Sequence, residues 1–103
     1  MTPEAGAQLL TVVAEMKAKP GKEAELRRAA MALVELTRQE EGCVQYDLHI
    51  HSSDAGRFVF YENWLSREHL ARHAASEHLK AFGALRADLL QEPPRVETYL
   101  RIA

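Results

Sequence analysis

The sequence has little cysteine and carries no signal for export or membrane insertion. Cys43 is the one cysteine in 103 residues, which excludes an internal disulfide and is typical of a reducing compartment. We expect it to be a buried strand residue rather than a nucleophile. The first residues, M-T-P-E-A-G-A-Q, lack the basic start and apolar run of a signal peptide, and no stretch approaches membrane-spanning length. The sequence therefore predicts a soluble, cytoplasmic protein.

Charge of one sign and cofactor-binding motifs are also lacking. The chain has 13 Lys and Arg against 15 Asp and Glu, and its basic residues are interleaved with acids, which argues against nucleic acid or an anionic membrane as a partner. The 5 glycines are isolated, so there is no phosphate-binding loop, and no G-x-S-x-G motif marks a serine nucleophile. We expect no nucleotide, flavin or nicotinamide cofactor, and an enzyme with this sequence would work with side chains alone.

Apolar patterning is clear along most of the chain and predicts a single domain at 9–103 after a disordered lead at 1–8. Apolar runs and strict alternation predict strands at 9–18, 43–51, 57–64 and 95–102. Helical spacing predicts one helix at 23–41, ended by Gly42, and helical pieces capped by Ser66 and Ser76 that end before Pro93. The order β-α-β-β-α-β is the ferredoxin-like plan, with both helical segments on one face of a four-stranded antiparallel sheet.

The face of the sheet without helices is predicted to be an association surface. The first and third strands carry apolar side chains on both parities, as in Leu10 and Val12 against Leu9 and Val13, whereas a solvated face would be polar. We expect a homodimer that packs sheet against sheet through this open face.

Glu62 is the carboxylate that needs an explanation, because it shares a strand face with Phe58, Phe60 and Trp64. A buried carboxylate must be paired, hydrogen-bonded or shifted in pKa. It would either orient a histidine or a substrate hydroxyl, or have a structural role, capping backbone or pairing with an arginine such as Arg86.

Three histidines follow on the predicted helical pieces. His69 and His73 are four residues apart and share a helix face, with His69 interpreted as a solvated residue, and His78 comes just after the Ser76 cap. Two histidines at this spacing can hold zinc, but the sequence has neither a cysteine nor an acid at a ligand-like spacing to complete the set. No metal site is predicted.

Three segments resemble the antibiotic biosynthesis monooxygenases and, within that family, the small quinol monooxygenases. They are T-V-V-A-E-M-K-A-K-P-G-K (11–22), E-E-G-C-V-Q-Y (40–46) and F-Y-E-N-W-L-S-R-E-H-L-A-R-H-A-A-S-E-H-L-K-A-F (60–82). The last is the most specific, because a strand with E-x-W is followed by a histidine nine residues after the tryptophan. The resemblance covers almost the whole chain in order and implies a dimeric ferredoxin-like α/β barrel.

The resemblance implies oxygenation of a small quinol, phenol or polycyclic aromatic compound by O₂, without metal or organic cofactor. The pocket would lie between the sheet and the helices of each subunit. Its aromatic wall would be formed by Trp64, Tyr46 and Phe82, although the spacing of Trp64 and Phe82 favours a core role over stacking on substrate. His73 is expected to be the proton acceptor or oxyanion partner and His78 the second candidate base. Glu62 would orient a histidine or a substrate hydroxyl.

Two other functions remain open at this point. Relatives with the same fold isomerise small metabolites, so the same histidine would serve as a proton shuttle in a reaction without O₂. A small-molecule-binding dimer without turnover is the third possibility.

Overall fold

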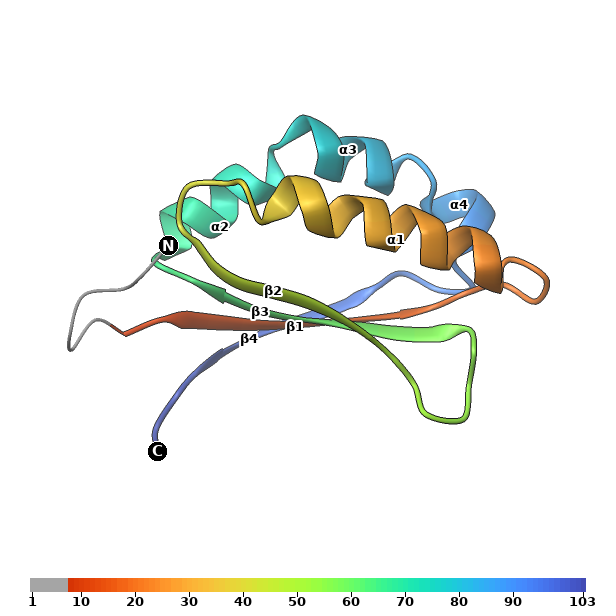
Figure 1. Ribbon diagram of the computed structural model, residues 1–103, viewed down its shortest axis with the longest axis horizontal. Coiled ribbons are helices and arrows are strands. Elements are labelled where there is room, and N and C mark those ends of the chain that lie inside the picture. Colours follow the sequence, from red (N-terminus) through yellow and green to blue (C-terminus); the bar gives the residue numbers. More distant parts are fainter. Residues whose placement is uncertain (1–7) are drawn as a thin grey trace.

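The computed structural model describes residues 8–103, so the predicted disordered lead lies outside the described residues apart from Gln8. The elements are β1 (Leu10–Lys17), α1 (Glu23–Thr37), β2 (Cys43–Ile50), β3 (Arg57–Trp64), α2 (Arg67–Ala74), α3 (Glu77–Gly83), α4 (Arg86–Leu89) and β4 (Arg95–Leu100). The four strands form one antiparallel sheet in the order β2-β3-β1-β4, and all helices lie on one face of it (Figure 1). The ferredoxin-like fold predicted from the sequence is confirmed.

The core lies between the sheet and the helices, where it takes in one parity of β1, β2 and β3, whereas β4 is exposed along its length. Val12 pairs with Glu62 and Glu62 pairs with Tyr46, so these three side chains form one row across the helix-covered face. Helix α1 buries Leu26 and Leu33 against this face. Trp64, at the end of β3, has no exposed surface.

Helix α1 ends earlier than the sequence predicted. The last helical residue is Thr37 instead of Glu41, and residues 38–42 form turns in which the amides of Glu40 and Cys43 donate to the carbonyls of Thr37 and Glu40. Gly42 follows with a φ of 87°, and a Cβ at this position would lie 2.2 Å from the ring of His69. Only glycine fits there, and the turns leave Glu40 on a loop that faces α2.

The two predicted caps are confirmed. Ser66 Oγ accepts a hydrogen bond from the amide of His69 at 3.2 Å, and Ser76 Oγ accepts one from the amide of Leu79 at 3.3 Å. Each hydroxyl satisfies an amide that the first helical turn leaves free. The chain therefore starts two short helices in different directions, and the break between them separates His73 from His78. Helix α4 is a further short piece that was not predicted separately.

The open face of the sheet is more polar than the strand patterns suggested. A chain of hydrogen bonds crosses it: Thr11 Oγ1 donates to Asn63 Oδ1 at 2.6 Å, and Asn63 Nδ2 donates to Gln45 Oε1 at 2.8 Å. Apolar area remains, because Tyr61 is 39% exposed and Tyr99 is 49% exposed. Within residues 8–103, no helix has the length and apolar character needed to cross a bilayer.

Candidate functional site

A cavity of about 300 Å³ lies between the sheet and helices α2 and α3, and we call it the histidine cavity. Its wall is largely apolar, and Glu62, His73, Arg86 and the phenol of Tyr46 are the ionisable groups in it. The lining residues are Val12, Ala14, Met16, Leu33, Tyr46, Phe60, Glu62, Leu70, His73, Ala74, Leu79, Phe82, Arg86, Pro94 and Val96. The volume suits a small aromatic molecule, and the few polar groups in an apolar wall are typical of a ligand site.

Glu62 is held at the cavity wall by its neighbour on the same strand face. Its side chain is 4% exposed, and Trp64 Nε1 donates a hydrogen bond to Glu62 Oε1 at 2.8 Å. Burial raises the pKa of Glu62 to about 7, and the charge of Glu40 adds to this rise, whereas the hydrogen bond from Trp64 opposes it. Within residues 8–103, Oε2 of Glu62 has no hydrogen-bond partner, and no ion pair joins Glu62 to Arg86. That oxygen is the one available to a molecule in the cavity.

His73 reaches the same cavity from α2. Its ring is 4% exposed and packs on the indole of Trp64, with 4.7 Å between ring centroids, while Tyr46 meets it edge-on at 5.4 Å. Its Nδ1 lies 2.6 Å from Oε2 of Glu40. A carboxylate oxygen accepts, so Nδ1 carries the ring proton and Nε2 is the unprotonated, basic nitrogen of the ring. Burial lowers the pKa of His73, against the opposing effect of Glu40.

Glu40 is a candidate site residue that sequence reasoning missed. Its Oε2 contacts both Nδ1 of His73 and Nε2 of His78, the latter at 2.7 Å, from 33 and 38 residues away along the chain. Glu40 is therefore the carboxylate in contact with the two histidines, whereas Glu62 accepts from Trp64. The one signal in the sequence is that Glu40 begins the E-E-G-C-V-Q-Y segment on which the family resemblance partly rests.

The predicted site residues fall into two groups. Glu62, His73, Tyr46 and Phe82 line the histidine cavity, and Trp64 lies behind it, in contact with both Glu62 and His73. His78 does not line it but joins His73 through Glu40, and its side chain is 18% exposed. Burial raises the pKa of the Tyr46 phenol, which keeps that hydroxyl neutral. Cys43 is buried and its thiol pKa is raised to about 11, mainly by burial, so it has no nucleophilic character near neutral pH.

The contacts of Glu40 also gather three possible metal ligands. Nδ1 of His73, Nε2 of His78 and a carboxylate oxygen of Glu40 all lie within 4.8 Å of one another. No such set was predicted, because its members come from the loop after α1, from α2 and from α3.

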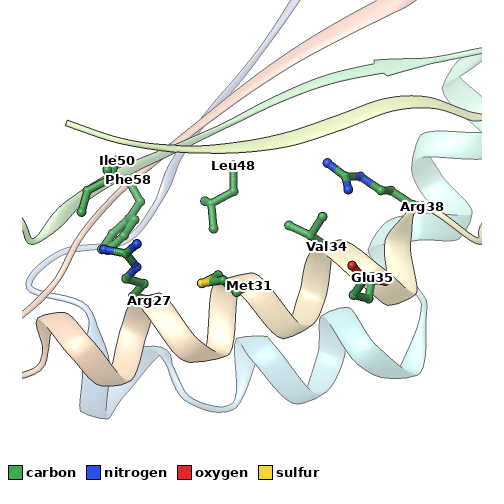
Figure 2. Close-up of a pocket in the computed structure, with 8 residues that line it drawn as sticks. All are labelled: Arg27, Met31, Val34, Glu35, Arg38, Leu48, Ile50 and Phe58. Atoms are coloured by element: carbon green, nitrogen blue, oxygen red, sulfur yellow. The ribbon is translucent and has the colours of Figure 1, made fainter. Parts of the chain in front are cut away.

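A second hollow, which we call the α1–β2 groove, measures about 330 Å³. Figure 2 shows Met31 and Val34 of α1 pointing toward Leu48 of β2. Arg38, one of the two arginines that line the groove, already has hydrogen-bond partners. It donates to the carbonyl of Tyr46 and to Asp47, each at 3.0 Å. The groove offers a molecule an apolar floor without a buried polar group.

Comparisons with known proteins agree with the fold described above. The family described as antibiotic biosynthesis monooxygenase matches residues 9–93. An Escherichia coli protein named probable quinol monooxygenase YgiN is 31% identical over 100 residues, covering 85% of this chain and 95% of its own length. The crystal structure of PA3566 from Pseudomonas aeruginosa superposes with a TM-score of 0.91 at 35% identity, covering 97% of this chain and 100% of that one. A longer Synechocystis protein is 28% identical over 90 residues, which span 61% of its length.

Proposed function

Because the chain belongs to the antibiotic biosynthesis monooxygenase family, we propose that it is a cofactor-independent monooxygenase that oxidises a small quinol or related phenol with O₂. The observation that supports this most strongly is the placement of two proton-transfer groups, Glu62 and His73, on the wall of one apolar cavity. The quinol substrate is suggested by the name of the Escherichia coli relative.

His73 is the proposed base. Nε2 takes the proton of a phenolic hydroxyl, and the resulting imidazolium is stabilised through Nδ1–H by the carboxylate of Glu40, 2.6 Å away. This arrangement resembles the histidine–carboxylate pair of serine hydrolases, in which the acid fixes the tautomer and does not itself take the proton. The phenolate anion is electron-rich enough to transfer one electron to O₂, and the two radicals then combine to a peroxide.

Glu62 is the proposed acid for the second half of the reaction. A carboxyl group with a pKa near 7 is substantially protonated at neutral pH, so it can donate to the distal oxygen as the O–O bond of the peroxide breaks. One oxygen atom enters the ring and the other leaves as water. A hydroquinone and O₂ thereby give a hydroxyquinone and water, and all four electrons come from the substrate. The apolar wall excludes bulk water from the intermediates.

We also propose that the protein works as a homodimer joined through the open face of the sheet. Half-buried Val13 and exposed Tyr61 give this face apolar area, and the Thr11–Asn63–Gln45 chain gives it satisfied polar groups. Tyr61→Glu is expected to dissociate the dimer in light-scattering measurements, and an unchanged mass would contradict this interface.

The test of the function is oxygen uptake by chelator-treated protein with a panel of hydroquinones. We expect one O₂ consumed per quinol above the rate of autoxidation with heat-inactivated protein, and ¹⁸O from ¹⁸O₂ in the product. Accumulation of hydrogen peroxide would indicate an oxidase instead. Product formed under strict anaerobiosis would favour the isomerase, since the pair of proton-transfer groups also suits a proton shuttle. Binding without any conversion across the panel would contradict the proposal.

A further inference from the structure

Glu40, His73 and His78 bring a nitrogen–nitrogen–oxygen ligand set together beside the histidine cavity, which His73 alone of the three lines. The three ligand atoms lie within 4.8 Å of one another. Two imidazoles and one carboxylate are the donors that zinc and neighbouring divalent transition metals take in proteins. Each residue comes from a different element, the loop after α1, α2 and α3, so the fold and not local sequence brings them together.

We propose that these three residues form a binding site for a divalent transition cation of the zinc class. The cation would replace the two hydrogen bonds by which Glu40 Oε2 holds Nδ1 of His73 and Nε2 of His78. Ligand atoms about 2.0 Å from a tetrahedral metal are about 3.3 Å apart. The nitrogen–oxygen distances of 2.6 and 2.7 Å therefore need to open by about 0.7 and 0.6 Å.

The surroundings of the site allow this adjustment. Glu40 lies on a loop, and its side chain is 15% exposed, while that of His78 is 18% exposed. Solvent can therefore reach the cation and supply a fourth ligand, whereas the ring of His73 is fixed by its contacts with Trp64 and Tyr46. One fixed imidazole and two partly exposed ligands form a site that can admit an ion from solvent.

Binding of the cation has a consequence for the histidine cavity. A metal on Nδ1 of His73 uses the lone pair of that nitrogen, so the ring proton moves to Nε2, the nitrogen that is otherwise unprotonated. His73 then presents a proton donor where it otherwise presents a base. This second part rests on the proposed function, and it predicts that the cation inhibits oxygen uptake, whereas the binding site itself does not depend on that function.

The experiment uses chelator-treated protein titrated with Zn²⁺ by calorimetry and with Co²⁺ by its visible absorption. We expect one ion per chain and the intense bands of a tetrahedral nitrogen–oxygen site. Glu40→Gln and His78→Gln should each weaken binding by more than roughly 100-fold, because losing a ligand costs more than losing an outer-shell partner. Absence of saturable 1:1 binding would overturn the site.

Matched controls lie beside the ligands. Glu41→Gln removes the neighbouring carboxylate, which is exposed and pairs with Arg72 at 3.7 Å, and His49→Gln removes an exposed histidine of β2. Both should bind the ion like the wild type, and a loss equal to that of Glu40→Gln would overturn the assignment. Circular dichroism verifies the fold of each variant.

The tautomer of His73 is read directly by long-range ¹H–¹⁵N correlation spectra. The proton is expected on Nδ1 in chelator-treated protein and on Nε2 after addition of Zn²⁺. Zn²⁺ binding that leaves the proton on Nδ1 would contradict the proposed change of tautomer. Oxygen uptake by metal-free protein tests the proposed function separately, since its absence together with Zn²⁺ binding would contradict the function and leave the site standing.

Discussion

The histidine cavity and the α1–β2 groove have nearly equal volumes, about 300 and 330 Å³, and both use the helix-covered face of the sheet. They differ in how their polar groups are held. Glu62 and His73 are each 4% exposed and have shifted pKa values, whereas the arginines of the groove are exposed and Arg38 already has partners. Volume therefore does not distinguish the histidine cavity from the α1–β2 groove. Burial of ionisable groups does, because desolvation raises the pKa of Glu62 and lowers that of His73.

The largest difference between the two hollows is expected in catalysis. His73→Gln should lower kcat/KM for a quinol by roughly 10²–10⁴-fold, the usual contribution of a general base. Arg27→Gln changes the lining of the α1–β2 groove instead. It should leave kcat/KM within about twofold of the wild-type value, since surface changes away from a site have small effects. The two rates are compared by oxygen uptake on folded protein. Equal rates for the two variants would remove the role given to His73.

The second prediction concerns stability and pH. Glu62 has a pKa of about 7 in the folded protein against an ordinary value of 4.5, so the folded state binds more protons between these two pH values. The free energy of unfolding should then fall as the pH rises through this window, by about 3 kcal/mol in all. Glu62→Gln keeps a hydrogen-bond acceptor for Trp64 but cannot ionise, so it should remove this fall in the free energy of unfolding at high pH.

Urea unfolding at pH 4.5 and pH 8 measures that difference. The variant should gain stability relative to the wild type at pH 8 and little at pH 4.5. Glu97→Gln is the control, because Glu97 is exposed and hydrogen bonds from Tyr99 and Arg95 lower its pKa, which gives a pH dependence of the opposite sign. A Glu62→Gln variant with the pH profile of the wild type would show that this carboxyl is not desolvated.

The sequence predicted contacts between residues close together in the chain better than contacts between residues far apart. Alternation in β2 and the caps Ser66 and Ser76 are local patterns, and the structure confirms them. The end of α1 was misplaced because the residues before Gly42 are helix formers with no local stop signal. Glu40 was missed for a related reason: its partners are 33 and 38 residues away, and no periodicity records such contacts.

For Glu62, the sequence predicted the burial of the side chain but not its hydrogen-bond partner. Its parity with Trp64 predicted burial, which the structure confirms, and left its partner open. The hydrogen bond from the Trp64 indole depends on side-chain geometry that a parity argument does not contain. The sequence therefore predicted which residues meet at the face of the sheet, but not which acid each histidine would contact.

The third prediction separates the hydrogen bond that Trp64 donates to Glu62 from the packing of its ring against His73. Trp64→Phe keeps an aromatic ring beside His73 but removes the hydrogen bond to Glu62 Oε1. We expect a loss of about 2 kcal/mol in the free energy of unfolding when Glu62 is ionised, the usual contribution of a hydrogen bond to a charged group. The pKa of Glu62 should also rise further, which ¹³C NMR of its carboxyl carbon measures. An unchanged Glu62 pKa would mean that packing alone accounts for Trp64.

The smallest effect is expected in the α1–β2 groove. Met31 is 54% exposed at its rim, so Met31→Gln should change the free energy of unfolding by no more than about 0.5 kcal/mol. Quinol oxidation should be unaffected, because the histidine cavity does not include this side chain. Urea unfolding at several protein concentrations is the appropriate measurement. A larger loss of unfolding free energy that depends on protein concentration would mean that a second chain covers the groove. The two hollows would then differ because one binds another chain, and not because of their ionisable groups.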